Sequence, residues 1–132
     1  MRITADTNVL VRAVVADDPA QSQAAIASLR NAEQIAVALP ALSEFVWVLR
    51  RVYSFPVAEI CAAIRALMEA GNVSLDRGSV EAGLAQLEAG GDFADAVIAH
   101  QGQWLGGDTF LSFDRQAVAL LQQRGIDAVL LR

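Results

Sequence analysis

Residues 1–12, MRITADTNVLVR, place an acid directly after a short apolar run. Arg2–Ala5 is typical of a strand, Asp6 follows it, and the apolar character resumes at Val9. An acid in this place is either the N-cap of the next helix or a site residue. The second possibility arises because ligands of open parallel α/β sheets bind beyond the carboxyl ends of the strands.

The rest of the chain alternates short apolar runs with longer stretches of helical periodicity. This alternation predicts βαβ units and a parallel sheet, and a length of 132 residues favours one domain spanning residues 1–132. The predicted strands are Arg2–Ala5, Ile35–Ala38, Asn72–Leu75, Thr109–Phe113 and Ala128–Leu131.

Several residues mark the ends of the predicted helices. Asp18 is the expected N-cap of a helix with Pro19 in its first turn, and Gly71 is an expected C-cap. The last helical segment is expected to end at Gly125. In the segment PALSEFVWVLRRVY, apolar residues recur at helical spacing, which predicts a buried stripe. These residues are Leu42, Phe45, Val46 and Leu49.

The composition excludes several kinds of protein. All ten basic residues are arginine, so the lysine of a P-loop or of a Schiff-base enzyme is missing. The single cysteine, Cys61, allows neither an internal disulfide nor a thiolate metal site. The single histidine, His100, has no second histidine at metal-ligand spacing, and we expect it to be half-buried or at the surface.

The charge pattern favours a soluble protein. The longest stretch without Asp, Glu or Arg is Ala96–Gly107, twelve residues, which is too short to span a bilayer. Asp6 interrupts the position where a signal peptide carries its apolar segment, so we expect a cytoplasmic location. The net charge of −5 gives no bulk attraction for nucleic acid, but a bound cation can supply positive charge locally.

Five acids fall at positions suited to a site. Asp6 and Asp114 each end a predicted strand, and their carboxylates converge if these strands are neighbours. Helix capping is the alternative for both. Glu44 is the only charged residue from Gln34 to Leu49, and it is either a site residue or a solvated helix residue.

The segment GGDFADAVIAH carries the other two acids. We expect Asp92 to cap the helix that follows the two glycines. Asp95 comes three residues later, in the first turn of that helix. An acid there can complete a capping box, interact favourably with the helix dipole or belong to a functional site.

Asp6, Glu44, Asp95 and Asp114 form a ligand set made only of oxygen atoms. Such a set suits a hard divalent cation, Mg²⁺ or Mn²⁺. A cation held there can activate a water, neutralise a phosphodiester and stabilise the leaving oxygen. The chemistry therefore predicts metal-dependent phosphodiester hydrolysis.

The segments ADTNVLVR, SEFVWVL, DFADAVIA and TFLSFDRQA, in this order, resemble the PIN-domain family. The closest likeness is to VapC-type toxins of bacterial type II toxin–antitoxin pairs. The resemblance spans residues 1–132 and implies an α/β/α sandwich with a central parallel sheet of about five strands. It also implies endoribonuclease activity dependent on Mg²⁺ or Mn²⁺. The implied metal-binding and catalytic acids are Asp6, Glu44, Asp95 and Asp114.

The resemblance extends to polar neighbours and partners. Thr7 and Asn8 match polar residues that follow the first acid, and we expect them to orient Asp6 or its bound waters while also capping the next helix. Ser112 and Arg115 match residues around the last acid, Ser112 as a further polar support and Arg115 as the candidate RNA contact. A VapC-like protein is expected to form a homodimer and to bind a VapB-like antitoxin with a basic inhibitory segment. Trp47 and Tyr53 are candidates for these surfaces, with core packing as the alternative.

Two other functions fit the same residues. A PIN nuclease can act in RNA processing without an antitoxin, and a PIN-like module can bind without catalysis. A gene for a small antitoxin immediately upstream distinguishes the first, and a metal titration distinguishes the second.

Overall fold

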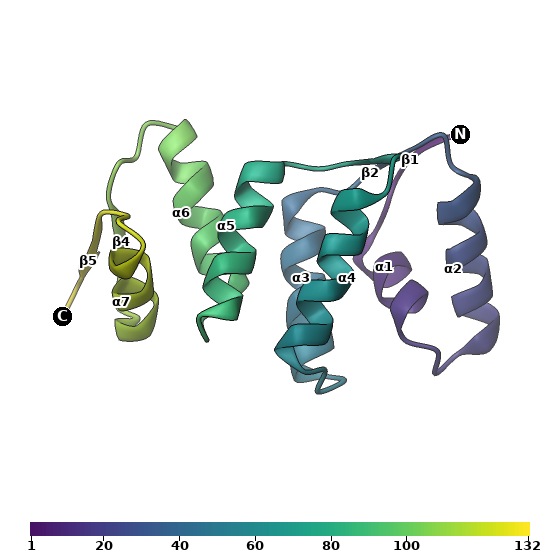
Figure 1. Ribbon diagram of the computed structural model, residues 1–132, viewed down its shortest axis with the longest axis horizontal. Helices are drawn as coiled ribbons and strands as arrows, with labels where there is room; N and C mark the ends of the chain where they lie inside the picture. The colour runs from purple at the N-terminus through teal and green to yellow at the C-terminus, as the bar shows by residue number, and fades with distance from the viewer. The chain divides into compact units, whose positions relative to one another are not determined.

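The computed structural model describes residues 1–132. The chain has seven helices and five strands in an α/β arrangement, as the alternating pattern predicts (Figure 1). It divides into two compact units, Met1–Asp76 and Arg77–Arg132. The α/β fold class, the parallel pairing and the number of strands expected from the sequence are therefore confirmed. The strands form one three-stranded and one two-stranded sheet, so a single central sheet, like the organisation as a single domain, stays a prediction.

The first unit is built on a three-stranded parallel sheet with the order β1-β2-β3. Ile3 of β1 pairs with Ile35 of β2, and Ile35 pairs with Val73 of β3. The elements of this unit are β1 (Arg2–Thr4), α1 (Thr7–Val14), α2 (Pro19–Asn31), β2 (Gln34–Ala36), α3 (Leu39–Arg51), α4 (Val57–Glu69) and β3 (Val73–Ser74).

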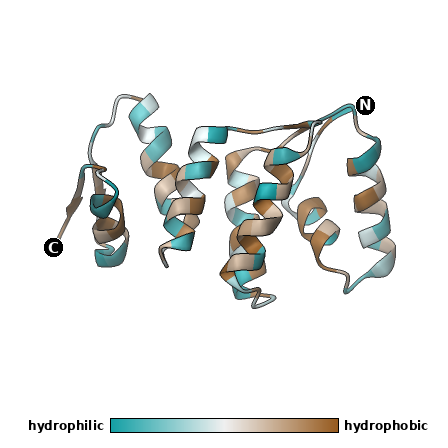
Figure 2. Cartoon of the chain, in the orientation of Figure 1, coloured by the Kyte–Doolittle hydropathy of each residue, from teal (hydrophilic) through white to brown (hydrophobic).

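The core of the first unit depends on the apolar stripe of α3. All four positions that the helical spacing selects are buried, and they are Leu42, Phe45, Val46 and Leu49. Each fully buried leucine contributes about 1.5–3 kcal/mol of apolar burial. Figure 2 shows the resulting mixture of hydrophobic and hydrophilic positions along the helices. The stripe fixes which side of α3 faces inward and leaves Glu44 exposed.

The second unit pairs two parallel strands, with Phe110 opposite Ala128. In its core, small residues of α6 pack against larger residues of α7. These residues are Ala96 and Ala99 on α6, and Val118 and Leu121 on α7. The elements of this unit are α5 (Arg77–Glu88), α6 (Phe93–Trp104), β4 (Phe110–Ser112), α7 (Arg115–Gln123) and β5 (Ala128–Leu130).

The ends of the elements differ from the predictions by a few residues. Asp18 caps α2 through a hydrogen bond from Gln21 N, as expected. The C-cap of α4 is Ala70, so the assignment of Gly71 as that cap was wrong by one residue. The C-cap of α7 is Arg124, one residue before Gly125, where the helical segment was expected to end. No helix is both long enough and apolar enough to cross a membrane.

Candidate metal centre

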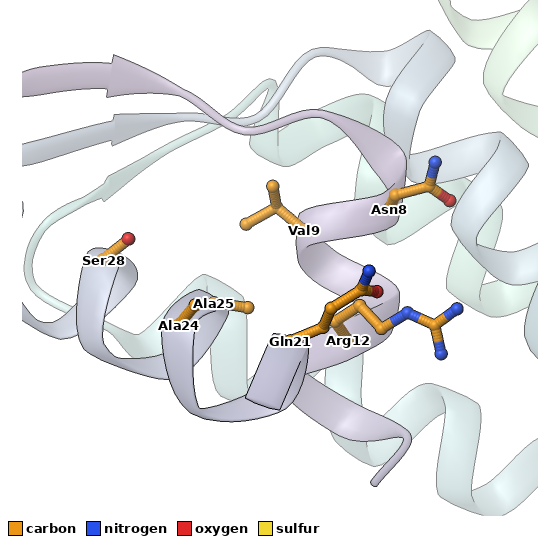
Figure 3. A pocket seen from close by; sticks show the side chains of 7 residues that line it. All are labelled: Asn8, Val9, Arg12, Gln21, Ala24, Ala25 and Ser28. Atoms are coloured by element: carbon orange, nitrogen blue, oxygen red, sulfur yellow. The ribbon is translucent and has the colours of Figure 1, made fainter. Parts of the chain in front are cut away.

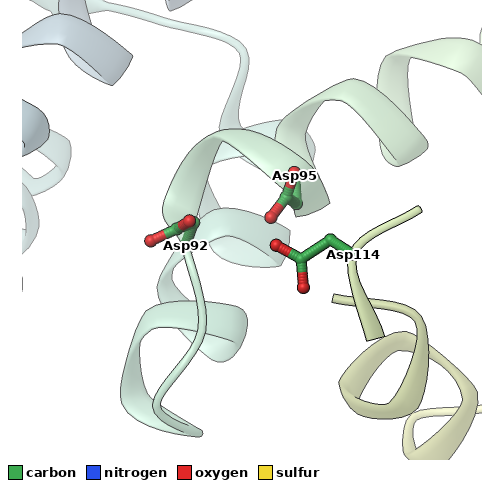
Figure 4. Close-up of side chains that lie close together, drawn as sticks. All are labelled: Asp92, Asp95 and Asp114. Atoms are coloured by element: carbon green, nitrogen blue, oxygen red, sulfur yellow. The ribbon is translucent and has the colours of Figure 1, made fainter. Parts of the chain in front are cut away.

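Three carboxylates gather in the second unit. Each of Asp92, Asp95 and Asp114 offers an oxygen, and these oxygens all lie within 4.8 Å of one another. Figure 4 shows the side chains of Asp95 and Asp114 pointing toward one another, with Asp92 at the start of α6. Two of the four acids selected from the sequence, Asp95 and Asp114, are therefore brought together within this unit.

The first turn of α6 is anchored by Phe93, which lies between the two acids of that helix in the sequence. Phe93 is buried and packs onto Gly83 of α5. A Cβ at Gly83 would lie 2.5 Å from Phe93 Cε2, so only glycine lets the ring approach this closely. Asp92 and Asp95 are three residues apart, a spacing that places two side chains on the same side of a helix.

Asp92 occupies the N-cap position of α6, but its side chain makes no capping hydrogen bond. The predicted N-cap position of Asp92 is therefore confirmed, but its carboxylate does not cap the helix. The side chain instead stands with the other two acids of the cluster. The three-residue spacing to Asp95 was the signal in the sequence that pointed to this arrangement.

Asp114 caps a helix and also belongs to the acidic cluster. One of its oxygens, Oδ1, accepts a hydrogen bond from Ala117 N at 2.9 Å and caps α7. Ser112 Oγ accepts a hydrogen bond from Asp114 N at 2.9 Å, so Ser112 fixes the backbone that carries the acid. Capping uses one oxygen of a carboxylate that has two, and so it is compatible with binding a cation. Arg115, the next residue, is exposed at the start of α7.

The electrostatics of the cluster act on Asp95. Burial raises the pKa of Asp95 above its usual value, and the negative charges of Asp92 and Asp114 raise this pKa further. Both effects disfavour the ionised carboxylate in the absence of a counter-charge. A divalent cation at this position would reverse the unfavourable term, because it neutralises the carboxylates around it.

The other two predicted acids, Asp6 and Glu44, belong to the first unit. Thr7 directly follows Asp6 in the sequence, and its side chain contacts Glu44. Asp6 precedes α1, is exposed and makes no side-chain capping hydrogen bond to that helix. Thr7 is buried, and its Oγ1 lies 3.4 Å from Glu44 Oε2 and 3.3 Å from Ala41 O. Thr7 was expected to orient Asp6. Its contact with Glu44 could not be predicted from the sequence, because the two residues are 37 positions apart.

Asn8 lies apart from these contacts. It lines a pocket of about 290 Å³ between α1 and α2 (Figure 3), with an apolar wall that includes Val9 and Ala25. Arg12, also on the wall, forms an ion pair with Asp17. The expected support of the first acid by Asn8 stays a prediction.

The donor chemistry of the cluster fits a hard cation. Carboxylate oxygens are the preferred ligands of Mg²⁺ and Mn²⁺, and no histidine or cysteine belongs to the group. The sole histidine, His100, instead lies 2.9 Å from the buried Ser79 hydroxyl through Nδ1. His100 is half-buried, as expected from the sequence.

The profile of the PIN domain family matches residues 3–120. The chain belongs to the PIN domain family. PIN domains are generally metal-dependent nucleases that act on RNA, and the acidic cluster of the second unit is consistent with that chemistry. The comparison with curated proteins found no match. Membership of the PIN family confirms the resemblance at family level, and the narrower likeness to VapC-type toxins stays a prediction.

Proposed function

We propose that this PIN domain is an endoribonuclease dependent on Mg²⁺ or Mn²⁺ and the toxin of a VapBC-type toxin–antitoxin pair. The observation that carries the nuclease proposal is the approach of three carboxylates to within 4.8 Å, because so many like charges together favour a bound cation. Membership of a nuclease family supports the same chemistry. The toxin role rests on the likeness of the four ordered sequence segments to VapC-type proteins.

The proposed metal ligands are Asp6, Glu44, Asp95 and Asp114. The bound cation would neutralise the phosphodiester and promote attack by water. The protein's own contribution is to hold the carboxylates in place: Ser112 fixes the backbone of Asp114, and the Thr7 hydroxyl contacts Glu44. Arg115, exposed beside Asp114, is proposed to bind an RNA phosphate. Asn8 is proposed as a further polar support near Asp6.

The proposed partners follow from charge and exposure. A chain of net charge −5 with an acidic site would be inhibited by a basic segment of an antitoxin, whose arginines can form bidentate contacts with carboxylates. The proposed homodimer would bury apolar surface, and Trp47 on α3 is 59% exposed. Tyr53, the other aromatic candidate, is half-buried and donates a hydrogen bond to Asp17.

The nuclease proposal is tested with purified protein and a mixed RNA substrate. We expect cleavage with Mg²⁺ or Mn²⁺, no cleavage with chelator, and loss of cleavage in the Asp95→Asn variant. Binding of RNA without cleavage at any metal concentration would instead support a silent binding module. A folded Asp95→Asn variant that retains full cleavage would remove Asp95 from the site.

The toxin proposal needs a separate experiment in cells. Pulsed expression of the wild type should arrest growth and create new RNA ends, which sequencing would map, whereas Asp6→Asn should do neither. Co-expression of a small protein encoded next to this chain should restore growth. Specific RNA ends without growth arrest would support an RNA-processing nuclease in place of a toxin.

A further inference from the structure

One side of α7 faces the turn that joins α5 to α6. Gln116, Leu120 and Arg124 are spaced four residues apart, so they form a single stripe along the helix. Each of the three meets the end of α5 or the glycine turn that follows it. We call these three residues the α7 stripe.

The contacts of the α7 stripe are specific. Gln116 Nε2 donates a hydrogen bond to Gly90 O at 3.1 Å. Arg124 Nη1 donates to Gln86 Oε1 at 2.6 Å, and the Gln86 side chain is fully buried. Gly91 N donates a hydrogen bond to Gln86 O at 2.9 Å. Gln86 therefore binds the turn through its backbone carbonyl and binds Arg124 through its side chain.

The middle contact depends on the absence of a side chain at Gly91. A Cβ at that position would lie 2.6 Å from Leu120 Cδ1 and 3.0 Å from Gln86 Cγ. Gly91 is buried, and its neighbour Asp92 begins the acidic cluster. Glycine at this position therefore lets the Leu120 side chain approach the turn more closely than any residue with a Cβ would.

The same two segments carry the three acids. Asp92 and Asp95 belong to the start of α6, immediately after the turn, and Asp114 caps α7. We infer that the α7 stripe, with Gln86 and Gly91, is a positioning device that sets the spacing between the α6 acids and Asp114 for cation binding. This inference rests on the proposed function, because it assigns the spacing to a metal centre.

The Gln86–Arg124 bridge supports a role beyond stability. Gln86 Nε2 and Arg124 Nη2 are buried without a hydrogen-bond partner. A buried donor without an acceptor is destabilising, and replacing both partners of such a pair by apolar groups of similar shape can be neutral or stabilising. If the bridge costs stability but orients α7, a variant without it should melt at the same or a higher temperature than wild type. The same variant should bind metal less tightly.

The main test introduces and then relieves a clash. Gly91→Val adds three carbon atoms where Leu120 lies, and Leu120→Ala removes three. The readout is the Mn²⁺ dissociation constant, measured by the electron paramagnetic resonance signal of free Mn²⁺. We expect Gly91→Val to weaken binding roughly tenfold or more, as disturbed support of metal ligands commonly does. The Gly91→Val/Leu120→Ala double variant should recover most of the affinity.

Two further variants make the test specific. Gly71→Val is the matched control, because Gly71 is exposed and a Cβ there meets no atom within 4 Å, so its Mn²⁺ affinity should equal that of wild type. Gln86→Leu/Arg124→Met should weaken Mn²⁺ binding while its melting temperature stays the same or rises. Circular dichroism confirms that each variant is folded.

The outcomes separate this inference from the nuclease proposal. A wild type that binds no Mn²⁺ would overturn the proposed metal centre itself. A wild type that binds, together with a folded Gly91→Val variant of equal affinity, would overturn only the positioning role. Failure of Leu120→Ala to restore a folded Gly91→Val variant would do the same. If Gly91→Val does not fold, the Gln86→Leu/Arg124→Met variant decides: unchanged affinity would overturn the inference.

Discussion

The hydroxyl of Thr7 lies 3.4 Å from the carboxylate of Glu44 and connects the start of α1 to α3. Thr7 directly follows Asp6, so a single residue is adjacent in the chain to one proposed ligand and in contact with another. Groups that hydrogen-bond to metal ligands orient them and raise their effectiveness.

The first prediction follows from this contact. Thr7→Val keeps the shape of the buried side chain and removes only the hydroxyl, whose single proton can be donated to Glu44 Oε2 or to Ala41 O. We expect nuclease activity to fall roughly 10–100-fold, the usual cost of losing support to a metal ligand. The free energy of unfolding should fall by about 0.5–1.5 kcal/mol. Thr7→Ser retains the hydroxyl and should keep most of the activity.

The second prediction separates helix capping by Asp114 from its proposed binding of metal. Asparagine caps helices nearly as well as aspartate, and Asp114→Asn also removes a charge that repels Asp95. The apo variant should therefore be at least as stable as wild type at neutral pH, while metal-dependent cleavage is abolished. Asp114→Ala should lose cleavage and also about 1 kcal/mol of stability through the lost cap. Denaturant unfolding and cleavage assays measure the two effects.

Asp18 provides the matched control for this experiment. It caps α2 through Gln21 N in the way that Asp114 caps α7, but it belongs to no group of three acids. Asp18→Ala should therefore show the same loss of stability with unchanged cleavage. An Asp114→Asn variant with full activity would mean that capping is the only role of Asp114.

The third prediction concerns Asp92, for which the structure changes the expectation from the sequence. As a helix cap, Asp92 would tolerate replacement by asparagine. As a member of the cluster without a capping hydrogen bond, it adds one negative charge within 4.8 Å of two other acids. We expect Asp92→Asn to weaken Mn²⁺ binding measurably in a titration. An affinity equal to that of wild type would leave Asp92 outside the metal centre.

The sequence carried the local features of this fold and fewer of its long-range contacts. The α3 stripe and the Asp18 cap follow from spacing over a few residues, and both are confirmed. The position of Asp92 could have been found from its three-residue spacing to Asp95. The contact between Thr7 and Glu44 spans 37 residues, and no local pattern encodes such a separation.

The candidate site was also predicted only in part. Residue chemistry selected Asp95 and Asp114, which the second unit brings together. Asp6 and Glu44 belong to the first unit, and their service in the same centre stays a prediction. The α7 stripe was not predicted from the sequence, because its role depends on contacts with the glycine turn, which is distant in the sequence.

The last prediction uses the raised pKa of Asp95 to test the cluster without RNA. An acid whose pKa is higher in the folded state than in the unfolded state binds its proton more tightly when folded. Its contribution to stability is therefore most favourable below the unfolded pKa and is lost as pH rises through the folded pKa. Since burial, Asp92 and Asp114 all raise the pKa of Asp95, ionised Asp95 should destabilise the apo protein at neutral pH.

The Asp95→Asn variant isolates this contribution from that of all other acids. At about pH 3 or below, under the ordinary aspartate pKa of about 3.9, Asp95 is mostly protonated in the unfolded chain and, because its pKa is raised, more so in the folded one, and the variant and wild type should melt at similar temperatures. At about pH 8 the apo variant should melt at a higher temperature, because one desolvated and repelled charge is gone. Mn²⁺ should raise the melting temperature of wild type more than that of the variant. A cation that binds only the folded state adds about 2.7 kcal/mol at roughly 100 times its dissociation constant. A variant that melts lower than wild type at both pH values, with an equal response to Mn²⁺, would show that Asp95 stabilises α6 and does not bind metal.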